Sequence, residues 1–224
     1  MKNNITSVYI TGFRGTGKST LGPLIAKKLQ WDYVDMDETI SKRANKSISE
    51  ITKNGTNWQD FRELEHELLK ELLTKENIVV TTGGGTEVND NQKNETGKTF
   101  GEINADLLKQ KDTALLILLY ADEDVLADRI KKHELAIFNK PAMRPILNEK
   151  YAQSVQTILA QYKNDPEKQK SVLIEHIVND GLQIYKKRKP LYMALTNHHI
   201  NTGVLSLEKS VDSILNLIGG AIDE

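Results

Sequence analysis

The sequence predicts an α/β fold in which a parallel β-sheet lies between two layers of helices. Short apolar runs rich in β-branched residues alternate along the chain with longer segments of helical periodicity, a pattern typical of parallel strands joined by crossover helices. The 224 residues are 38% hydrophobic and 27% charged, an ordinary balance for a globular domain with one buried core. We therefore expect a single domain spanning residues 1–224.

Five segments have the length and composition of strands, and four have helical periodicity. The expected strands are Ser7–Thr11, Tyr33–Asp35, Ile78–Thr82, Ala114–Ala121 and His198–Thr202. The expected helices are Lys18–Leu29, Asn57–Lys75, Asp122–Lys132 and Ser206–Leu217.

Two long segments depart from this alternation. Thr86–Thr99 is polar and rich in Asn and Lys, so we expect an exposed loop. Asn148–Lys187 is charged and helical, with a break near Asn164–Pro166, because proline disfavours helix for the residue before it. We interpret residues 148–187 as a helical insertion, formed by helices that either pack on the domain or present a surface to a partner.

The charge and the composition exclude several classes of protein. The 30 basic and 31 acidic residues leave a formal charge of -1, which does not favour binding to nucleic acid or to an anionic membrane. Without cysteine the chain has no disulfide, no thiolate nucleophile and no cysteine-bound zinc. No apolar run approaches the roughly 20 residues that span a bilayer, and no signal-peptide pattern is present, so we expect a cytoplasmic protein.

The first expected strand runs into a glycine-rich segment. Gly12-Phe13-Arg14-Gly15-Thr16-Gly17-Lys18-Ser19 fits the pattern G-x-x-x-x-G-K-[ST], here between a strand and an amphipathic helix. Glycines let successive backbone N–H groups point at phosphate oxygens, and the start of the following helix adds positive potential. In such a P-loop the lysine reaches the β- and γ-phosphates and the hydroxyl ligates Mg²⁺.

The sequence therefore predicts a site for ATP and Mg²⁺, with Lys18 taking part in catalysis and Ser19 binding the metal. The alternative is a plain glycine turn between a strand and a helix. The residues expected to bind ATP are Gly12, Gly15, Thr16, Gly17, Lys18, Ser19 and Thr20.

Two aspartates close the second expected strand. The carboxyl ends of parallel strands face the ligand crevice, and residues i and i+2 of an extended chain point to the same side. Asp35 and Asp37 can then both face the phosphate loop, one organising Mg²⁺ through water and the other accepting a proton from an attacking hydroxyl. The alternative is an exposed strand end, or Asp37 acting only as a helix cap.

Three consecutive glycines follow the third expected strand. Such a run is entropically costly, and it makes sense where the backbone must approach a ligand closely. We expect Gly83, Gly84 and Gly85 to line the acceptor site; a flexible hairpin is the alternative.

These motifs, in their order along the chain, resemble those of the shikimate kinase family. The P-loop alone is shared by many NTPases, whereas the joint occurrence of the others is specific. The matching segments are Gly12–Thr20, Asp35-x-Asp37, Phe61-Arg62-x-x-Glu65, Gly83–Gly85, Arg144-Pro145-Ile146-Leu147 and Arg188-x-Pro190-Leu191-Tyr192.

The resemblance implies a role for each matching residue on the acceptor side. Asp35 would organise the metal through water, and Asp37 would bind the acceptor hydroxyl as the candidate base. Arg62, next to Phe61 in the acceptor site, and Arg188 would bind the shikimate carboxylate, to which a guanidinium makes two parallel bonds. The glycine run would supply backbone N–H groups to the acceptor.

Both arginines also have a plain structural explanation. Arg62 has acidic neighbours on its helix, where surface ion pairs are common. Arg188 lies within Lys186–Lys189, which could be a solvated basic run.

On the nucleotide side, the resemblance implies that Arg144 is a lid arginine that closes over the phosphates and stabilises charge on the transferring group. Arg129 would lie against the adenine ring, and Ile200-Asn201-Thr202 would belong to the adenine-side segment.

The resulting expectation is a three-layer α/β/α P-loop domain with a five-stranded parallel sheet, acceptor-binding helices at about 37–73 and a lid at about 131–147. The implied reaction is ATP-dependent phosphorylation of the 3-hydroxyl of shikimate, a step of chorismate and aromatic amino-acid biosynthesis. The rivals are another small-metabolite kinase, such as a gluconate kinase, and a nucleotide-binding regulator without catalysis. We expect a monomer, with oligomerisation through the insertions left open.

Overall fold

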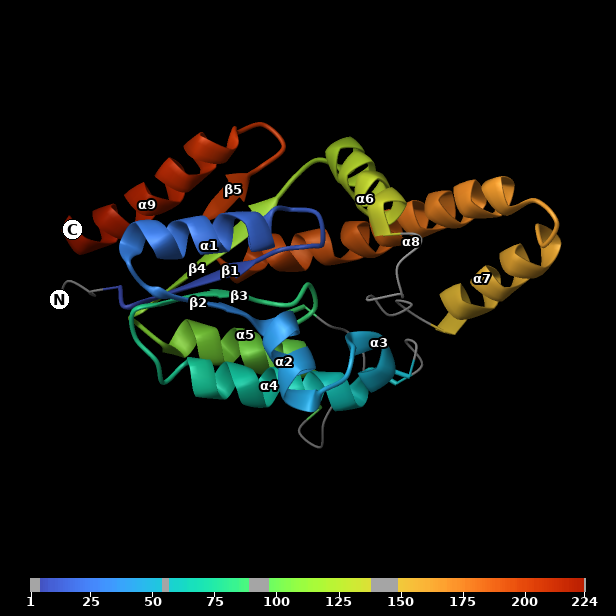
Figure 1. Ribbon diagram of the computed structural model, residues 1–224. Coiled ribbons are helices and arrows are strands. Elements are labelled where there is room, and N and C mark those ends of the chain that lie inside the picture. The colour runs from blue at the N-terminus through green and yellow to red at the C-terminus, as the bar shows by residue number, and fades with distance from the viewer. Residues whose placement is uncertain (1–4, 54–56, 89–96, 138–148, 224) are drawn as a thin grey trace.

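A five-stranded parallel sheet forms the centre of the protein (Figure 1). The computed structural model describes residues 5–53, 57–88, 97–137 and 149–223, with side chains for 5–53, 57–88, 97–136 and 154–219. The strands lie in the order β2-β3-β1-β4-β5, so the expected fold class is confirmed. Their bounds are β1 (Ser7–Thr11), β2 (Asp32–Asp35), β3 (Ile78–Thr81), β4 (Ala114–Tyr120) and β5 (His199–Asn201).

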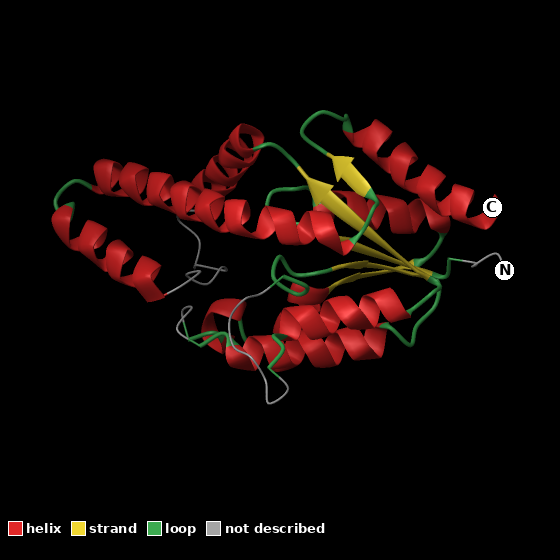
Figure 2. Cartoon of the chain, turned by 180° about the vertical axis from the view of Figure 1, so that it is seen from behind, coloured by secondary structure: helices red, strands yellow, loops and turns green. Residues whose placement is uncertain are grey.

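Helices cover both faces of this sheet. Those in the described residues are α1 (Lys18–Leu29), α2 (Met36–Ala44), α3 (Ile48–Ile51), α4 (Gln59–Leu72), α5 (Phe100–Gln110), α6 (Glu123–Ile137), α7 (Glu149–Gln161), α8 (Pro166–Leu195) and α9 (Leu207–Asp223). Figure 1 shows α1 and α9 on one face and α4 and α5 on the other, and Figure 2 shows the same layers from behind.

Side-chain alternation along the strands explains these layers. On β1, Val8 and Ile10 belong to the core under α1 and α9, whereas Tyr9 belongs to the core under α2, α4 and α5. On β4, Ile117 faces the first core, and Leu116 faces the second. Strands that are buried on both faces have continuous apolar sequences, so they can be recognised from the sequence.

A third core connects α6 and α8 to the sheet and to the loop after β1. It contains Phe13, Leu118, Leu126, Tyr185 and Tyr192, all buried. The inner half of α8 therefore packs on the domain, while α7 and the outer half of α8 project from it as a hairpin (Figures 1 and 2). The expected break lies between α7 and α8, where Pro166 occupies the first turn of α8 and its missing N–H costs nothing.

The expected geometry of the aspartate pair is wrong. The second strand ends at Asp35, whose Oδ1 accepts a hydrogen bond from the backbone N–H of Glu38 and so caps α2. Asp37 lies in the first turn of that helix rather than on the strand. The chain turns between the two carboxylates, so strand alternation does not orient them.

The expectation of one exposed loop over Thr86–Thr99 is also wrong at both ends. Thr86, Glu87 and Val88 are buried directly after the glycine run, and Thr99 is a buried N-cap. Thr99 forms a capping box with Glu102 and begins α5, a helix that the sequence analysis missed. Burial here depends on α4, to which α5 packs, and the polar composition does not reveal it.

No helix in the described part of the chain is long and apolar enough to cross a membrane.

The close packing of α1 on the sheet can be tested at Gly22, where an added Cβ would lie 2.6 Å from Tyr33 Cε2 and 2.7 Å from Thr81 Cγ2. We expect Gly22→Ala to lower the free energy of unfolding by about 1–3 kcal/mol, as overpacking usually does. Gly219 of α9 is a matched control, because nothing lies within 4 Å of a Cβ at that position. Gly219→Ala should be neutral or slightly stabilising. Equal urea midpoints for the two variants would contradict this account.

Candidate active site

The loop between β1 and α1 has the backbone of a phosphate cradle. Gly12, Gly15 and Gly17 have φ of 139°, 82° and 93°, in the region that side chains rarely adopt. A Cβ on Gly12 would also lie 2.2 Å from the carbonyl oxygen of Leu119. The loop is braced from inside by Thr16, whose Oγ1 donates to the Phe13 carbonyl at 2.7 Å. Both the curvature and the close packing therefore require the glycines.

Helix α1 begins at Lys18, and Thr20 lies in its first turn. The Lys18 ammonium donates to the carbonyls of Gly12 at 2.6 Å and Phe13 at 3.1 Å, so it lies over the loop itself. The N–H of Thr20 donates to the Gly17 carbonyl at 3.1 Å. A cation, a glycine-rich loop and a helix N-terminus at one place form a site suited to phosphate.

Asp35 lies beside this cradle. Its Oδ2 accepts hydrogen bonds from Ser19 Oγ at 3.2 Å and from Thr81 Oγ1 at 3.1 Å. The Tyr33 hydroxyl lies 2.9 Å from Thr81 Oγ1. A hydroxyl and a carboxylate next to a phosphate site are hard oxygen donors, which is the donor set that Mg²⁺ accepts together with phosphates and water. The residues present therefore fit the predicted metal.

Asp37 lies on the acceptor side of the cradle, close to Gly83 and Glu65. A Cβ on Gly83 would lie 2.7 Å from Asp37 Oδ1 and 2.4 Å from Glu65 Oε1. Asp37 Oδ1 is buried and has no hydrogen-bond partner in the part of the chain that the structure describes. Burial, together with the charges of Glu65 and Asp35, raises the pKa of Asp37 to about 6, although Lys18 and Arg62 oppose the shift.

Arg62 is buried against the third glycine. Only 6% of the residue is exposed, and its guanidinium pairs with Glu65, whose other oxygen accepts from Thr86 Oγ1 at 2.7 Å. A Cβ on Gly85 would lie 2.5 Å from Arg62 Nη2. The surface ion pair considered for Arg62 is therefore wrong.

Two aromatic rings support the Arg62 guanidinium. Its Cζ lies 4.8 Å from the ring centre of Trp58 and 5.5 Å from that of Phe61. Phe61 is buried in the core below α4, so it holds the arginine from the helix side.

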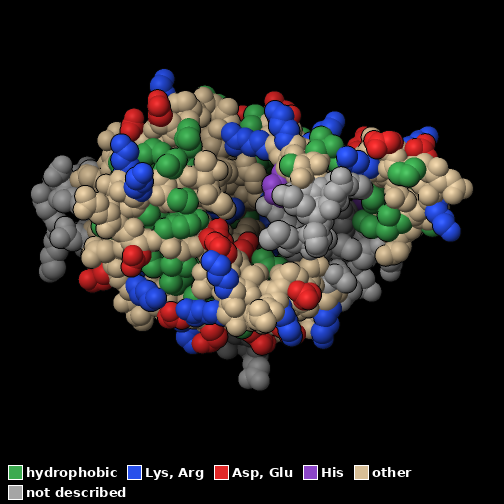
Figure 3. All heavy atoms as spheres, viewed as in Figure 1, with side chains coloured by type: hydrophobic (Ala, Val, Ile, Leu, Met, Phe, Trp, Pro, Cys, Tyr) green, Lys and Arg blue, Asp and Glu red, His purple; other side chains and the backbone are tan. Residues whose placement is uncertain are grey.

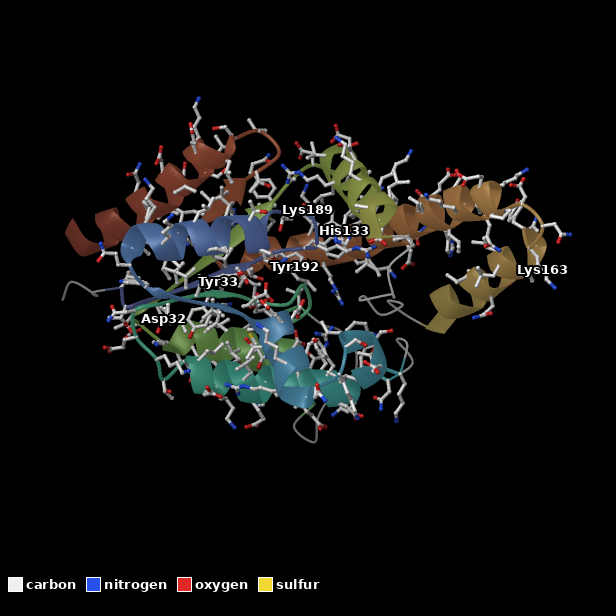
Figure 4. The ribbon with its side chains drawn as sticks, in the orientation of Figure 1. Asp32, Tyr33, His133, Lys163, Lys189 and Tyr192 are labelled. Carbon is white, nitrogen blue, oxygen red and sulfur yellow. The ribbon has the colours of Figure 1, made fainter. Side chains whose placement is uncertain are left out.

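Arg188 and Tyr192 of α8 reach the middle glycine. Arg188 Nη1 donates to the Gly84 carbonyl at 2.9 Å, and the Tyr192 hydroxyl donates to the same oxygen at 2.5 Å. Burial raises the pKa of Tyr192, so the phenol keeps its proton. Figure 4 shows Tyr192 on the part of α8 that runs beside the sheet. Arg188 is thus tied to the glycine run, unlike a freely solvated basic side chain.

The middle of α8 is fixed to the phosphate loop by Arg14. Its Nη2 donates to the carbonyl of Ile177 at 3.1 Å, and a Cβ on Gly181 would lie 2.4 Å from the same nitrogen. Sequence analysis gave Arg14 no role. The contact joins residues 163 positions apart, which no local pattern reveals.

Arg129 joins the phosphate loop to the segment after β5. Its guanidinium donates to the Gly15 carbonyl at 3.1 Å, to Thr202 Oγ1 at 2.9 Å and to the Thr202 carbonyl at 2.7 Å. Arg129 and the Ile200–Thr202 segment therefore lie together, on the opposite side of the loop from the glycine run. Arg144, and most of the expected lid, lie outside the described residues.

Glu87 is a buried carboxyl group that sequence analysis also missed. Its Oε2 accepts a hydrogen bond from Thr11 Oγ1 at 2.8 Å, and only 3% of the residue is exposed. Burial raises the pKa of Glu87 to about 7, with a further contribution from the charge of Glu65, while Thr11 and Thr82 oppose the shift.

The surface over this region is hollowed (Figure 3). In Figure 3, acidic side chains gather near the middle of the visible face, over the start of α2 and next to a hollow. The hollow adjoins the carboxyl ends of the strands, where ligands bind in open α/β sheets.

Comparison with known proteins identifies relatives over most of the chain. A family model described as "Shikimate kinase" matches residues 14–219. A shikimate kinase of Chlorobaculum parvum is 32% identical over 179 residues, which cover 79% of this chain and 85% of that protein. A bifunctional shikimate kinase/3-dehydroquinate synthase of Thermotoga maritima is 35% identical over 143 residues, covering 63% of this chain but 24% of that protein. For other relatives named shikimate kinase, the chain spans 39% to 65% of their length.

The fold is also found among solved structures. A shikimate kinase from Acinetobacter baumannii in complex with shikimate superposes with a TM-score of 0.64 and 23% sequence identity, covering 97% of this chain and 95% of that one. At this identity the likeness concerns the fold alone.

The buried Glu87 predicts a specific dependence of stability on pH. The folded protein holds the proton more tightly than the unfolded chain, so this group lowers stability as pH rises from 4.5 to about 7. The difference between these two pKa values corresponds to about 3 kcal/mol of unfolding free energy. We expect Glu87→Gln to raise Tm clearly at pH 8 and to leave it nearly unchanged at pH 4.5.

A matched control is Glu175→Gln on the exposed face of α8, which should not shift Tm at either pH. A gain in Tm for Glu87→Gln that is the same at both pH values would contradict this account, because it would show that folding leaves the pKa of Glu87 unchanged.

Proposed function

The chain belongs to the shikimate kinase family, and we propose that it transfers the γ-phosphate of ATP to the 3-hydroxyl of shikimate. The observation that carries the proposal is the meeting of Asp37, Arg62 and Arg188 at the glycine run Gly83–Gly85, next to the phosphate loop. A hydroxy acid has two parts to bind. Its hydroxyl requires a carboxylate that can accept the proton, and its own carboxylate requires guanidinium groups.

The acceptor carboxylate would bind between Arg62 and Arg188. Both guanidinium groups contact the glycine run, Arg62 at Gly85 and Arg188 at the Gly84 carbonyl. Planar guanidinium groups make paired, charge-assisted bonds to a carboxylate, and these bonds fix its direction. We propose residues 37–73 as the main acceptor-binding region, completed by Arg188 of α8.

The acceptor hydroxyl would bind to Asp37. Its buried Oδ1 can accept a hydrogen bond, and a pKa of about 6 leaves the group mostly ionised at neutral pH. Asp37 then orients the hydroxyl and takes its proton as the new P–O bond forms. A carboxyl group with a pKa near the working pH can both accept and release that proton.

The transferred phosphoryl group would be held by the loop N–H groups and by Lys18, which offset its charge. Mg²⁺ would be held by Ser19 and, through water, by Asp35; when bound, it neutralises phosphate charge and orients the leaving oxygens. We propose that the segment 131–147 is a lid that excludes water and so limits hydrolysis of ATP. Arg144 of this segment would bind the phosphates. We assign Arg129 to the adenine side of the nucleotide.

The same proposal includes a monomer in the cytoplasm, where the product would enter aromatic amino-acid biosynthesis. A gluconate kinase remains the competing assignment; a gluconokinase from Sinorhizobium meliloti shares the fold alone, with a TM-score of 0.51 at 13% identity. Gluconate also carries one carboxylate, but a different acceptor would not require the run Gly83–Gly85 together with Arg62 and Arg188.

A coupled ADP-release assay with shikimate, quinate and gluconate tests the assignment. We expect turnover with shikimate, weaker or no turnover with quinate, and none with gluconate. Loss of turnover in Lys18→Met would show that the activity belongs to this protein. Turnover with gluconate alone would overturn the proposal, and nucleotide binding without turnover on any acceptor would support a regulator.

Arg188 gives a sharper test than Arg62, because removing Arg62 would leave Glu65 buried and unpaired. We expect Arg188→Ala to raise KM for shikimate about 10- to 100-fold, the equivalent of one or two charge-assisted hydrogen bonds. Calorimetric affinity for ADP should stay within about twofold. Lys187→Ala, an exposed neighbour on the same helix, is the matched control and should change neither value.

If Arg188→Ala weakened ADP and shikimate equally, its role would be to hold α8 against the sheet and not to bind the acceptor.

A further inference from the structure

We propose that the hydroxyl groups of Tyr33 and Thr81 are positioning groups, which fix Asp35 and Ser19 for the divalent cation that accompanies the nucleotide. The inference rests on the proposed nucleotide site and adds two residues to it. Neither residue lies in a motif of the sequence. Both become visible only where two strands and a helix come together.

The geometry centres on one carboxylate. Asp35 Oδ1 is occupied by the cap of α2, where it accepts from the N–H of Glu38 at 3.1 Å. Asp35 Oδ2 accepts from Ser19 Oγ at 3.2 Å and from Thr81 Oγ1 at 3.1 Å. With both oxygens engaged, the carboxylate is held in a single orientation.

The pairing of two strands places these groups side by side. Asp35 of β2 and Thr81 of β3 are register partners in the parallel sheet. Tyr33 lies two residues before Asp35, so its side chain points to the same face, the one covered by α1. Figure 4 shows Tyr33 on β2 beneath α1. A slip of one residue in this register would turn Thr81 away from Asp35.

The direction of each hydrogen bond follows from counting protons. An ionised carboxylate only accepts, so Thr81 gives its one hydroxyl proton to Asp35. The Tyr33 hydroxyl, 2.9 Å from Thr81 Oγ1, must therefore donate to it. Its distance to Asp35 Oδ2 is 3.5 Å, the longer of its two contacts. Burial raises the pKa of Tyr33 to about 12, and the phenol keeps the proton it donates.

This arrangement orients the hydroxyl of Ser19 for metal binding. Because its proton is given to Asp35, both lone pairs of its oxygen are left for a cation beside the phosphates. The hydrogen bond from Tyr33 to Thr81 polarises the Thr81 hydroxyl and so strengthens the bond that Thr81 donates to Asp35. Groups of this kind behind a metal ligand commonly alter metal affinity 10- to 100-fold.

A purely structural role would not require these hydroxyl groups. Thr81 is 1% exposed and its methyl group faces α1, so valine would fill the same space. The Tyr33 ring packs against Gly22 of α1, and phenylalanine would make that contact equally well. The hydroxyl groups connect these residues to Asp35, and the packing contacts at Gly22 do not depend on them.

The test measures metal binding without an acceptor. Purified full-length wild type, Thr81→Val, Thr81→Ser and Tyr33→Phe are titrated with Mn²⁺ in the presence of ADP, and free Mn²⁺ is followed by electron paramagnetic resonance. In parallel, ADP affinity is measured by calorimetry in EDTA. Tyr162→Phe, which removes a phenol hydroxyl on the distant α7–α8 turn, is the matched control.

We expect Thr81→Val to raise the Mn²⁺ concentration for half-saturation about tenfold and Tyr33→Phe about threefold, because Tyr33 acts through Thr81. Thr81→Ser keeps the hydroxyl and should restore binding to within about twofold of wild type. ADP affinity in EDTA and Tm should not change.

Half-saturation within about twofold of wild type in Thr81→Val would overturn the proposal, and so would equal losses in Thr81→Val and Thr81→Ser. A parallel fall of Tm or of metal-free ADP affinity would do the same, because it would mean a structural effect. The titration contains no acceptor. An error in the shikimate assignment would therefore leave it intact and would appear only in the ADP-release assay.

Discussion

The glycine run after β3 is the constraint on which the rest of the site depends, because groups from α2 and α4 occupy the space where side chains of Gly83 and Gly85 would be. A Cβ on Gly83 would overlap Asp37 of α2 and Glu65 of α4, and a Cβ on Gly85 would overlap the Arg62 guanidinium. The Gly84 carbonyl accepts bonds from α8. The charged groups can approach one another and an acceptor only because the backbone between them carries no side chains.

Helix α8 links the two halves of this site. Near its middle, Arg14 of the phosphate loop donates to the Ile177 carbonyl across Gly181, and near its end Arg188 and Tyr192 donate to the glycine run. The two sets of contacts therefore lie on one helix. The phosphate loop and the acceptor loop are thereby held in one frame, which is what direct transfer between two bound molecules requires.

Several ionisable groups lie close together in and behind the acceptor site. Three carboxyl groups, Asp37, Glu65 and Glu87, lie in or behind the acceptor site together with the buried Arg62. Glu65 shares the guanidinium, while burial raises the pKa of Asp37 to about 6 and that of Glu87 to about 7. The Arg62–Glu65 pair compensates two of the charges, and the raised pKa values of Asp37 and Glu87 reflect the cost of placing further carboxylates where hydration is reduced.

The sequence by itself determined those features that depend on neighbouring residues or on a repeating pattern. The apolar strands, the phosphate loop before α1 and the run Gly83–Gly85 follow from short-range sterics and periodicity, and neighbouring residues suffice to reveal them. What only the tertiary structure decided was which polar groups meet. Whether Arg62 lies on the surface or in the interior, and whether Thr81 contacts Asp35, depends on strand register and helix packing between residues far apart in the chain. Burial and hydrogen bonding are properties of those pairs, so no single segment encodes them.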